Sequence, residues 1–177
     1  MSHASAALRP GHLSVTDDGR SALTRPAVPA DHTAVNAMYD RCSPESRFRR
    51  YQTARPGLTR AEWLSLTRPD RGVSWITHPA EDPGRIVAAT HVFRTATTGN
   101  GELAILVEDS WQSVGLGTIL VRQALRQAGR LGMASVQVLT HRDNHRMLSI
   151  CRSFGARIPQ TGGPTVDLTL AIAEEAP

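Results

Sequence analysis

Residues 102–117 place the strongest constraint on the fold, because they join a strand to a helix through two closely spaced glycines. Glu102 to Val107 has the composition of a strand, and Gln112 to Gly117 opens a segment of helical period. Gly115 and Gly117 allow the backbone to turn and to approach a ligand without interference from a Cβ atom. Unpaired N–H groups at a helix start favour an anion. The junction therefore predicts a phosphate-binding loop.

This loop differs from the two common nucleotide-binding loops. A P-loop needs Lys followed by Ser or Thr, and the Rossmann spacing needs a glycine at position 120, where this chain has Leu120. A Gly-x-Gly pair on its own also fits a tight connection that binds nothing. Both interpretations stay open on the loop alone.

The order of the predicted elements indicates an α/β fold with a mixed sheet flanked by helices. Pro29, the Ser43-Pro44-Glu45 run and the Thr59/Glu62 capping box each mark a helix start. The Gly99-Asn100-Gly101 turn joins two strands as a hairpin. We expect strands over residues 22–25, 73–77, 85–94, 102–107, 135–140 and 165–172, and helices over residues 29–40, 43–51, 59–66, 115–128 and 144–154. A strand meander followed by strand, helix, strand, helix and strand calls for both antiparallel and parallel pairs.

Length and composition predict one globular domain. The chain has 177 residues, 40% of them hydrophobic, which is enough for a single core. We expect residues 1–20 to be a flexible leader without a periodic apolar face, and residues 21–173 to be the domain. No window approaches the ~18 apolar residues of a membrane span, and two cysteines make no disulfide framework. These features predict a cytoplasmic protein with no membrane partner.

The loop and the elements after it resemble the GNAT acetyltransferase superfamily. Residues 107–117 are similar to its motif A, a strand followed by Gln/Arg-x-x-Gly-x-Gly/Ala. Asn144, Met147 and the Phe154-Gly155 close resemble the next block of the family, although the family has Gly-Phe in that order. The resemblance implies a GNAT fold, in which a mixed, mostly antiparallel sheet splays to form an acetyl-CoA cleft. It extends over about residues 22–172.

Two further segments resemble the protein lysine acetyltransferase (Pat) group of that superfamily. Ser43 to Tyr51 is similar to the Ser-Pro-Glu-Ser-x-Tyr-x-Arg-Phe signature of the group, with Phe48 and Tyr51 exchanged. Glu102 at the head of its strand and the Trp111-Gln112 pair also match the group. The resemblance implies transfer of an acetyl group from acetyl-CoA to a protein lysine side chain.

The resemblance also implies which residues bind acetyl-CoA. Backbone N–H groups near Val107 are expected to hold the pantetheine and polarise the thioester carbonyl. Asn144 is expected to reach the cofactor across the cleft, to cap its own helix, or to do both. No metal ligands are expected. Amides or hydroxyls for the pyrophosphate are expected from Gln112, Val114, Gly115, Gly117 and Thr118. Ser113 and Leu116 of the same loop are also expected to bind the cofactor.

Glu102 is the candidate catalytic base. An amine with a pKa near ~10 is mostly protonated at neutral pH, so a base must remove a proton for it to attack the thioester. Many GNAT enzymes have a tyrosine seven residues after the asparagine to protonate the leaving thiolate, whereas this chain has Cys151 there. Glu108 and Asp109 are alternative bases or solvated turn acids, and His141 is a proton-transfer candidate or a structural histidine.

All twenty basic residues are arginine, and residues 1–60 hold nine of them against five acids. They suit CoA phosphates, an acidic protein partner or an ordinary solvated helix face, and Phe48 and Tyr51 alone make too small an aromatic platform for nucleic acid. The cluster consists of Arg41, Arg47, Arg49, Arg50, Arg55 and Arg60.

The sequence therefore predicts an acetyl-CoA-dependent N-acetyltransferase, a monomer or a homodimer, with a protein lysine as the favoured acceptor. A transferase acting on a small amine and a non-catalytic acyl-CoA-binding sensor module remain as alternatives. The glycine loop fits all three, Glu102 favours the two enzymes, and Ser43 to Tyr51 favours the protein acceptor.

Overall fold

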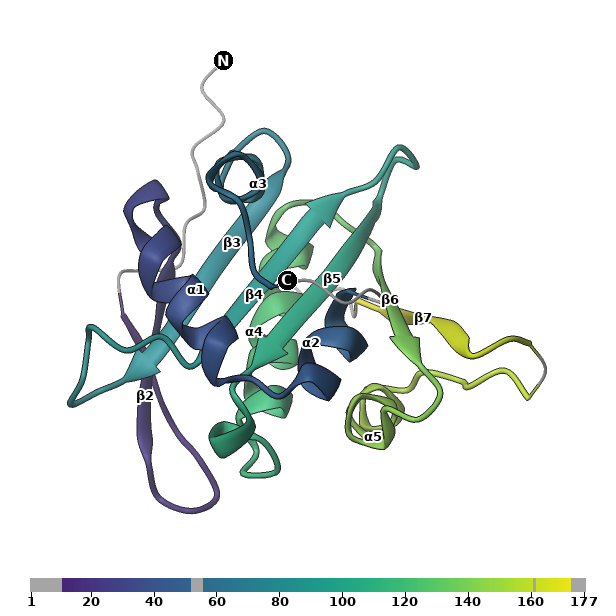
Figure 1. The fold of residues 1–177 in the computed structure, drawn as a ribbon. Helices are drawn as coiled ribbons and strands as arrows, with labels where there is room; N and C mark the ends of the chain where they lie inside the picture. The colour runs from purple at the N-terminus through teal and green to yellow at the C-terminus, as the bar shows by residue number, and fades with distance from the viewer. Residues whose placement is uncertain (1–10, 52–55, 161, 173–177) are drawn as a thin grey trace.

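The computed structural model describes residues 11–51, 56–160 and 162–172, which form a seven-stranded sheet with helices packed against it (Figure 1). The strands lie side by side in chain order, and every neighbouring pair is antiparallel except β5 and β6. The strands are β1 (His12–Val15), β2 (Ser21–Pro26), β3 (Gly72–Pro79), β4 (Ala88–Arg94), β5 (Asn100–Val107), β6 (Ser135–His141) and β7 (Thr165–Ala171). The helices are η1 (Pro29–Asp31), α1 (His32–Arg41), α2 (Pro44–Tyr51), α3 (Arg60–Leu66), η2 (Asp109–Trp111), α4 (Leu116–Arg130) and α5 (His145–Ser153). The predicted mixed sheet is confirmed.

The parallel strands β5 and β6 pair over three residues and then separate. Asn100–Glu102 lies in register with Ser135–Gln137, and in the described part of the sheet this pairing goes no further. β5 follows β4 along its whole length, while β6 follows β7. The sheet therefore opens into a wedge toward the ends of the two strands at Val107 and His141, and the arrows of β5 and β6 diverge downward in Figure 1.

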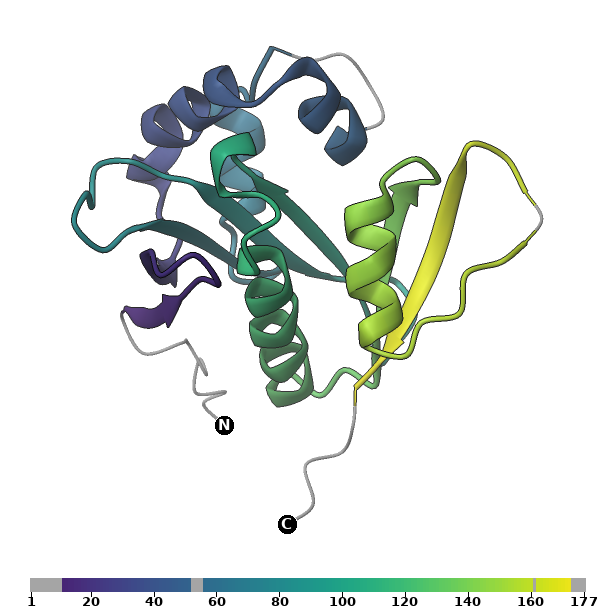
Figure 2. The same cartoon turned by 90° about the horizontal axis from the view of Figure 1, so that it is seen from below.

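Two apolar cores fill the layers on the opposite faces of the sheet (Figure 2). One packs α1 and α3 against β3, β4 and β5, with Trp63 and Met38 fully buried. The other packs α4 and α5 against β5, β6 and β7. Side chains alternate along a strand, so in β5 Leu106 enters the first core and Leu103 the second.

The helix ends carry the chemistry that the sequence predicts. Thr59 and Glu62 form the capping box of α3, in which the Thr59 hydroxyl accepts from the Glu62 N–H. Asn144 caps α5, and Gly155 follows that helix in the left-handed conformation at φ 87°. No helix in residues 11–51, 56–160 and 162–172 combines the length and the apolar character needed to cross a membrane.

The expected leader is corrected where the structure describes it. Residues 12–15 form β1 and pair with β2, and the Asp17 N–H donates to the Val114 carbonyl (2.9 Å). Folded structure thus begins before Ala22, while residues 1–10 of the leader lie outside the described residues. The strand expected from Arg85 begins at Ala88.

His91 is a neutral histidine buried between β4 and α3. The Ser74 hydroxyl donates its one hydrogen to the Leu66 carbonyl (2.6 Å), so it accepts from Nδ1 of His91 (2.7 Å). The His91 ring stacks on Phe93 with centroids 5.6 Å apart. Complete burial, with a smaller effect from the Arg50 charge, lowers the pKa of His91 to about 3.

We expect His91 to make the protein acid-sensitive. Below pH 6.5 the unfolded chain takes up a proton at His91, whereas the folded protein does so only near pH 3. Stability is therefore lost as the pH falls through this window, by up to roughly tenfold in the unfolding equilibrium constant per pH unit. Urea unfolding of His91→Gln between pH 7.5 and 5 should have a shallower pH slope than wild type. The exposed His12→Gln variant is the control, and equal slopes for His91→Gln and wild type would contradict the assignment.

Candidate active site

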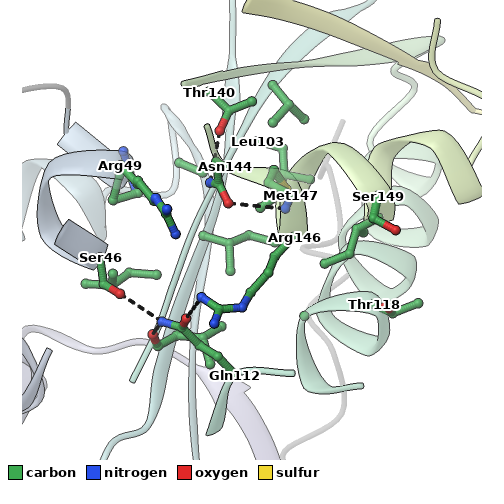
Figure 3. Close-up of a pocket in the computed structure, with 18 of the residues that line it drawn as sticks. Ser46, Arg49, Leu103, Gln112, Thr118, Thr140, Asn144, Arg146, Met147 and Ser149 are labelled. Atoms are coloured by element: carbon green, nitrogen blue, oxygen red, sulfur yellow. Dashed lines mark hydrogen bonds between the residues drawn. The ribbon is translucent and has the colours of Figure 1, made fainter. Parts of the chain in front are cut away.

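A cavity of about 720 Å³ lies in the wedge between β5 and β6. Its walls come from β5, β6, the loop before α4, the first turns of α4 and α5, and one face of α2. In Figure 3, Ser46 and Arg49 of α2 lie opposite Asn144 and Arg146 at the start of α5. The structure gathers most of the predicted site residues around this cavity, namely Glu102, Val107, Gln112, Ser113, Gly115, Gly117, Thr118 and Asn144.

Val114 and Leu116 are the two predicted site residues that do not line the cavity. Leu116 is 1% exposed and packs with Trp111 in a third apolar cluster, against which Val114 also packs. Their side chains thus anchor the loop to the sheet. Only their backbone groups remain available for a ligand.

The loop before α4 has the backbone shape of an anion site. Ser113 (φ 61°) and Gly115 (φ 82°) both adopt the left-handed region, and α4 begins directly afterwards at Leu116. Successive N–H groups in such a turn, together with the first N–H groups of a helix, converge on a point outside the backbone. This part of the site can hold a pyrophosphate.

The two glycines of the loop serve different purposes. A Cβ on Gly115 would lie 2.6–2.9 Å from the carboxylate of Asp17, which reaches the loop from the β1–β2 turn. A Cβ on Gly117 would lie 3.0 Å from Cδ1 of Ile150, so that glycine allows α4 and α5 to pack closely. Asp17 is a cavity residue that the sequence analysis missed, because it fell within the expected leader.

The start of α5 contributes a cap and a cation. The Asn144 Oδ1 accepts from the Met147 N–H (3.2 Å), and its Nδ2 donates to the Thr140 hydroxyl (3.0 Å). The helix-cap interpretation of Asn144 is therefore confirmed. Arg146 extends from α5 to the loop, donating to Oε1 of Gln112 (2.8 Å) and to the Ser113 hydroxyl (2.9 Å). The sequence analysis missed Arg146, although it lies two residues after the predicted Asn144.

Glu102 stands at the inner end of the wedge. It is exposed, it lines the cavity, and its neighbours across the sheet are Phe93 of β4 and Gln137 of β6. By the alternation of β5, its side chain lies on the same face of the sheet as Leu106, the face that α1 and α3 cover. A carboxylate in this position can accept a proton from a group that enters the wedge.

Glu108 is neither a base nor a solvated turn acid. Its side chain is 4% exposed and forms ion pairs with Arg41 (2.9 Å) and Arg85, and it also accepts from the Ser110 hydroxyl (2.8 Å). Burial alone would raise the pKa of Glu108, but the hydrogen bonds from Arg41, Ser110 and Arg85 hold it below its usual value. Glu108 thus fixes the end of α1 to the end of β5.

Asp109 holds α2 in the same way. It accepts from the backbone N–H of Ser43 (2.8 Å), from the Ser43 hydroxyl (2.8 Å) and from the Ser46 hydroxyl (2.9 Å). Partial desolvation would raise the pKa of Asp109, but these hydrogen bonds lower it. The two serines of the Ser-Pro-Glu-Ser run therefore anchor the helix, and Ser46 does so from the wall of the cavity.

The arginine-rich segment divides among several places. Arg49 and Arg50 line the cavity, Arg41 pairs with Glu108, and Arg60 begins α3. Arg55 lies outside the described residues. The described arginines of the segment therefore do not form one continuous basic surface.

Neither cysteine has the environment of a proton donor in the cavity. Cys151 is fully buried in the core between α4, α5 and β7, and burial raises the pKa of its thiol to about 11. Burial, followed by the nearby charges of Asp109 and Glu108, raises the pKa of the Cys42 thiol to about 12. His141 also stays outside the cavity lining, with its ring edge-on to Phe48.

A sheet that opens between two parallel strands, with a glycine turn leading from the first strand into a helix, is the arrangement expected of a GNAT fold with its acetyl-CoA cleft. Residues 33–156 match the Acetyltransferase (GNAT) family. The chain belongs to this family, and it is an acetyltransferase that uses acetyl-CoA.

Several known proteins resemble this chain. An acetyltransferase of Pseudomonas aeruginosa is 26% identical over 144 residues, which are 78% of this chain and 76% of that protein. The GNAT domain of PAT from S. lividans superposes with a TM-score of 0.81 at 20% identity, covering 91% of this chain and 96% of that one. The acetyltransferase yncA of Salmonella typhimurium, whose structure contains acetyl-CoA, gives a TM-score of 0.68 at 16% identity, with 88% and 96% covered.

The residues around the cavity fit acetyl-CoA. Positive φ angles at Ser113 and Gly115 form a concave turn of N–H groups suited to a pyrophosphate, and Arg146 adds a positive charge beside it. The open edge of β5 leads from this turn toward Glu102. Acetyl-CoA, when bound, supplies an activated acetyl group as a thioester.

We expect acetyl-CoA binding to depend on the backbone at Gly115 and not on that at Gly132, a glycine of similar conformation. Gly115→Ala and Gly132→Ala both introduce a Cβ at positive φ (82° and 76°), which costs roughly 1–2 kcal/mol of stability. At Gly115 the new Cβ would also meet the Asp17 carboxylate, whereas nothing lies within 4 Å at Gly132. Calorimetric titration should therefore find weaker acetyl-CoA binding in Gly115→Ala only. Equal affinity in the two variants would contradict the loop's role in binding.

Proposed function

We propose that this acetyltransferase acts on an amine, with Glu102 as the general base and a protein lysine side chain as the acceptor. One observation carries the base assignment: Glu102 is an exposed carboxylate that lines the cavity at the point where β5 and β6 separate. An acceptor amine in the wedge would come within reach of this carboxylate.

The chemistry requires such a base. A lysine ammonium has a pKa of about 10.4, so almost none of it is a nucleophile at neutral pH. Glu102 takes a proton from the nitrogen, directly or through a water, while the new N–C bond forms and the C–S bond of the thioester breaks. The sulfur leaves as a thiolate with a solution pKa of about 8.5, which accepts its proton from water. This step needs no acid at Cys151.

The cofactor contacts follow from the backbone of the open wedge. The N–H groups near Val107 would donate to the thioester carbonyl as it gains negative charge. The amides and hydroxyls of Gln112–Thr118 would hold the pyrophosphate, with Arg146 as a counter-charge. Asn144 would support the same site by holding the start of α5 in place.

Two observations support a protein lysine as the acceptor. Ser43 to Tyr51, which resembles the signature of the Pat group, contains α2, and this helix lines the cavity. The GNAT domain of S. lividans PAT also covers 91% of this chain. Because α2 forms a wall of the cavity, we expect two transferases with similar acceptors to have similar sequences in this helix.

We expect Glu102→Gln to lower kcat by roughly 10²–10⁴ while acetyl-CoA binds as in wild type, because the amide keeps the shape and loses the basic oxygen. Glu81→Gln, at an exposed acid in the β3–β4 connection, is the matched control. The release of CoA thiol measures turnover, and calorimetry measures binding. Full turnover in Glu102→Gln would exclude Glu102 as the base.

A panel of lysine peptides, acyl-CoA synthetases and small amines identifies the acceptor class. The chain contains no lysine, so every acetyl-lysine detected must come from the acceptor. Turnover that depends on protein lysine supports the proposal. Turnover with small amines alone would replace it with a small-molecule acetyltransferase, and binding without any turnover would indicate a sensor module.

A further inference from the structure

A continuous series of hydrogen bonds runs from Asp109 to the last residue of β5. The Ser46 hydroxyl donates to Oδ1 of Asp109 (2.9 Å) and accepts from Nε2 of Gln112 (3.0 Å). The same Nε2 donates to the carbonyl of Val107 (2.8 Å). Figure 3 shows the bonds from Gln112 to Ser46 and from Arg146 to Gln112 at the edge of the cavity. We call the three side chains Asp109, Ser46 and Gln112 the amide relay.

Every bond of the amide relay has a fixed direction. A hydroxyl has one hydrogen, and Ser46 gives it to the Asp109 carboxylate, so the Ser46 oxygen can only accept from Gln112. The amino group of Gln112 must then face Ser46 and Val107, and its carbonyl oxygen is left to accept from Arg146 (2.8 Å). The relay thus sets which end of the Gln112 amide meets the backbone of β5.

The Val107 carbonyl needs this partner because it faces the wedge. The Glu108 N–H donates to the Val87 carbonyl (2.8 Å), so the backbone N–H of residue 108 points toward the β4 side of β5. Because backbone groups alternate along an antiparallel strand, the N–H and carbonyl groups of Val107 and Ile105 point away from β4. The described pairing with β6 has already ended at Glu102. The Gln112 side chain therefore supplies the hydrogen bond that the N–H of an adjoining strand would otherwise donate to the Val107 carbonyl.

The consequence is that the last carbonyl of the edge no longer faces a ligand. With the Val107 carbonyl occupied by Gln112, the groups of Val107 and Ile105 that remain turned toward the wedge are their two N–H donors and the Ile105 carbonyl. The same relay holds Ser46 and with it α2, which lines the cavity above β5. One set of bonds thus fixes both the end of β5 and the helix beside it.

We propose that Gln112 is a positioning residue of the acetyl transfer, and that Ser46 and Asp109 orient its amide so that the end of β5 presents donors to the thioester carbonyl. This inference rests on the acetyl transfer proposed above, but it does not depend on Glu102 or on the identity of the acceptor. Gln112, from which a pyrophosphate contact was expected, acts here through its side chain on the backbone of β5.

Gln112→Glu tests the relay with almost no change of shape. The carboxylate cannot donate to the Val107 carbonyl, so kcat should fall about tenfold. CoA lacks the thioester carbonyl, and so the variant should weaken acetyl-CoA about threefold to tenfold more than CoA. Calorimetric titration of both ligands gives this ratio without any turnover.

Two serines that share Asp109 separate positioning from simple anchoring. Ser46→Ala removes the group that orients Gln112. Ser43→Ala removes a bond to Asp109 and one from the Ser46 N–H, neither of which involves the Ser46 hydroxyl or Gln112. Both variants should lose similar thermal stability, but only Ser46→Ala should lower kcat, by about threefold. Ser46→Thr keeps the hydroxyl and should restore kcat.

The outcomes are distinct from those of the base assignment. A loss of kcat in Gln112→Glu and Ser46→Ala, with acetyl-CoA weakened more than CoA and Ser43→Ala unaffected, supports the relay whatever Glu102→Gln does. Unchanged kcat in a folded Gln112→Glu, equal weakening of CoA and acetyl-CoA, or equal losses of kcat in Ser43→Ala and Ser46→Ala would each overturn it.

Discussion

The separation of β5 from β6 leaves one strand edge without a partner strand among residues 11–51, 56–160 and 162–172. A strand edge carries polar groups that must be satisfied locally or by a ligand. Here the separation starts after Glu102 and Gln137. The carbonyl at the far end of β5 accepts from Gln112, and the wedge itself becomes the cavity. The unpaired backbone groups of β5 can form hydrogen bonds with an extended ligand, so the unpaired part of the strand can serve as a binding site.

Two adjacent acids make that open end rigid from both sides. Glu108 is buried against Arg41 and Arg85, which fixes α1 and the segment before β4. Asp109 accepts three hydrogen bonds from Ser43 and Ser46, which fixes α2. Because successive side chains leave the backbone in different directions, one dipeptide ties two helices to the end of β5.

Local signals in the sequence were sufficient for most of the fold, and the failures share one cause. The capping box at Thr59, the turn at Gly99 and the glycine loop depend on neighbours a few residues away, and all of them are found in the structure. The bond from Ser46 to Asp109 joins residues 63 positions apart, and the bond from Arg146 to Gln112 spans 34. Such contacts leave no periodic trace in a single sequence. β1 was missed for the same reason, since four residues are stabilised by pairing with β2 rather than by their own pattern.

The two ends of β5 have different roles: the Glu102 end must be held in place, and the Val107 end must be open to a ligand. A base has to keep its position relative to a proton, and Glu102 lies where the backbone is paired with β4 on one side and β6 on the other. A thioester site has to admit a ligand, and Val107 lies where β6 has moved away and only a side chain has taken its place. Five residues, about 17 Å of extended strand, separate these two ends. The reacting carbonyl therefore has to lie between them, near the Ile105 N–H, so that Glu102 can reach the attacking amine through a water. A single strand can serve as both a fixed support and an open edge only if the adjoining strand departs between them, and so the point of separation, more than any one side chain, determines what the site can do.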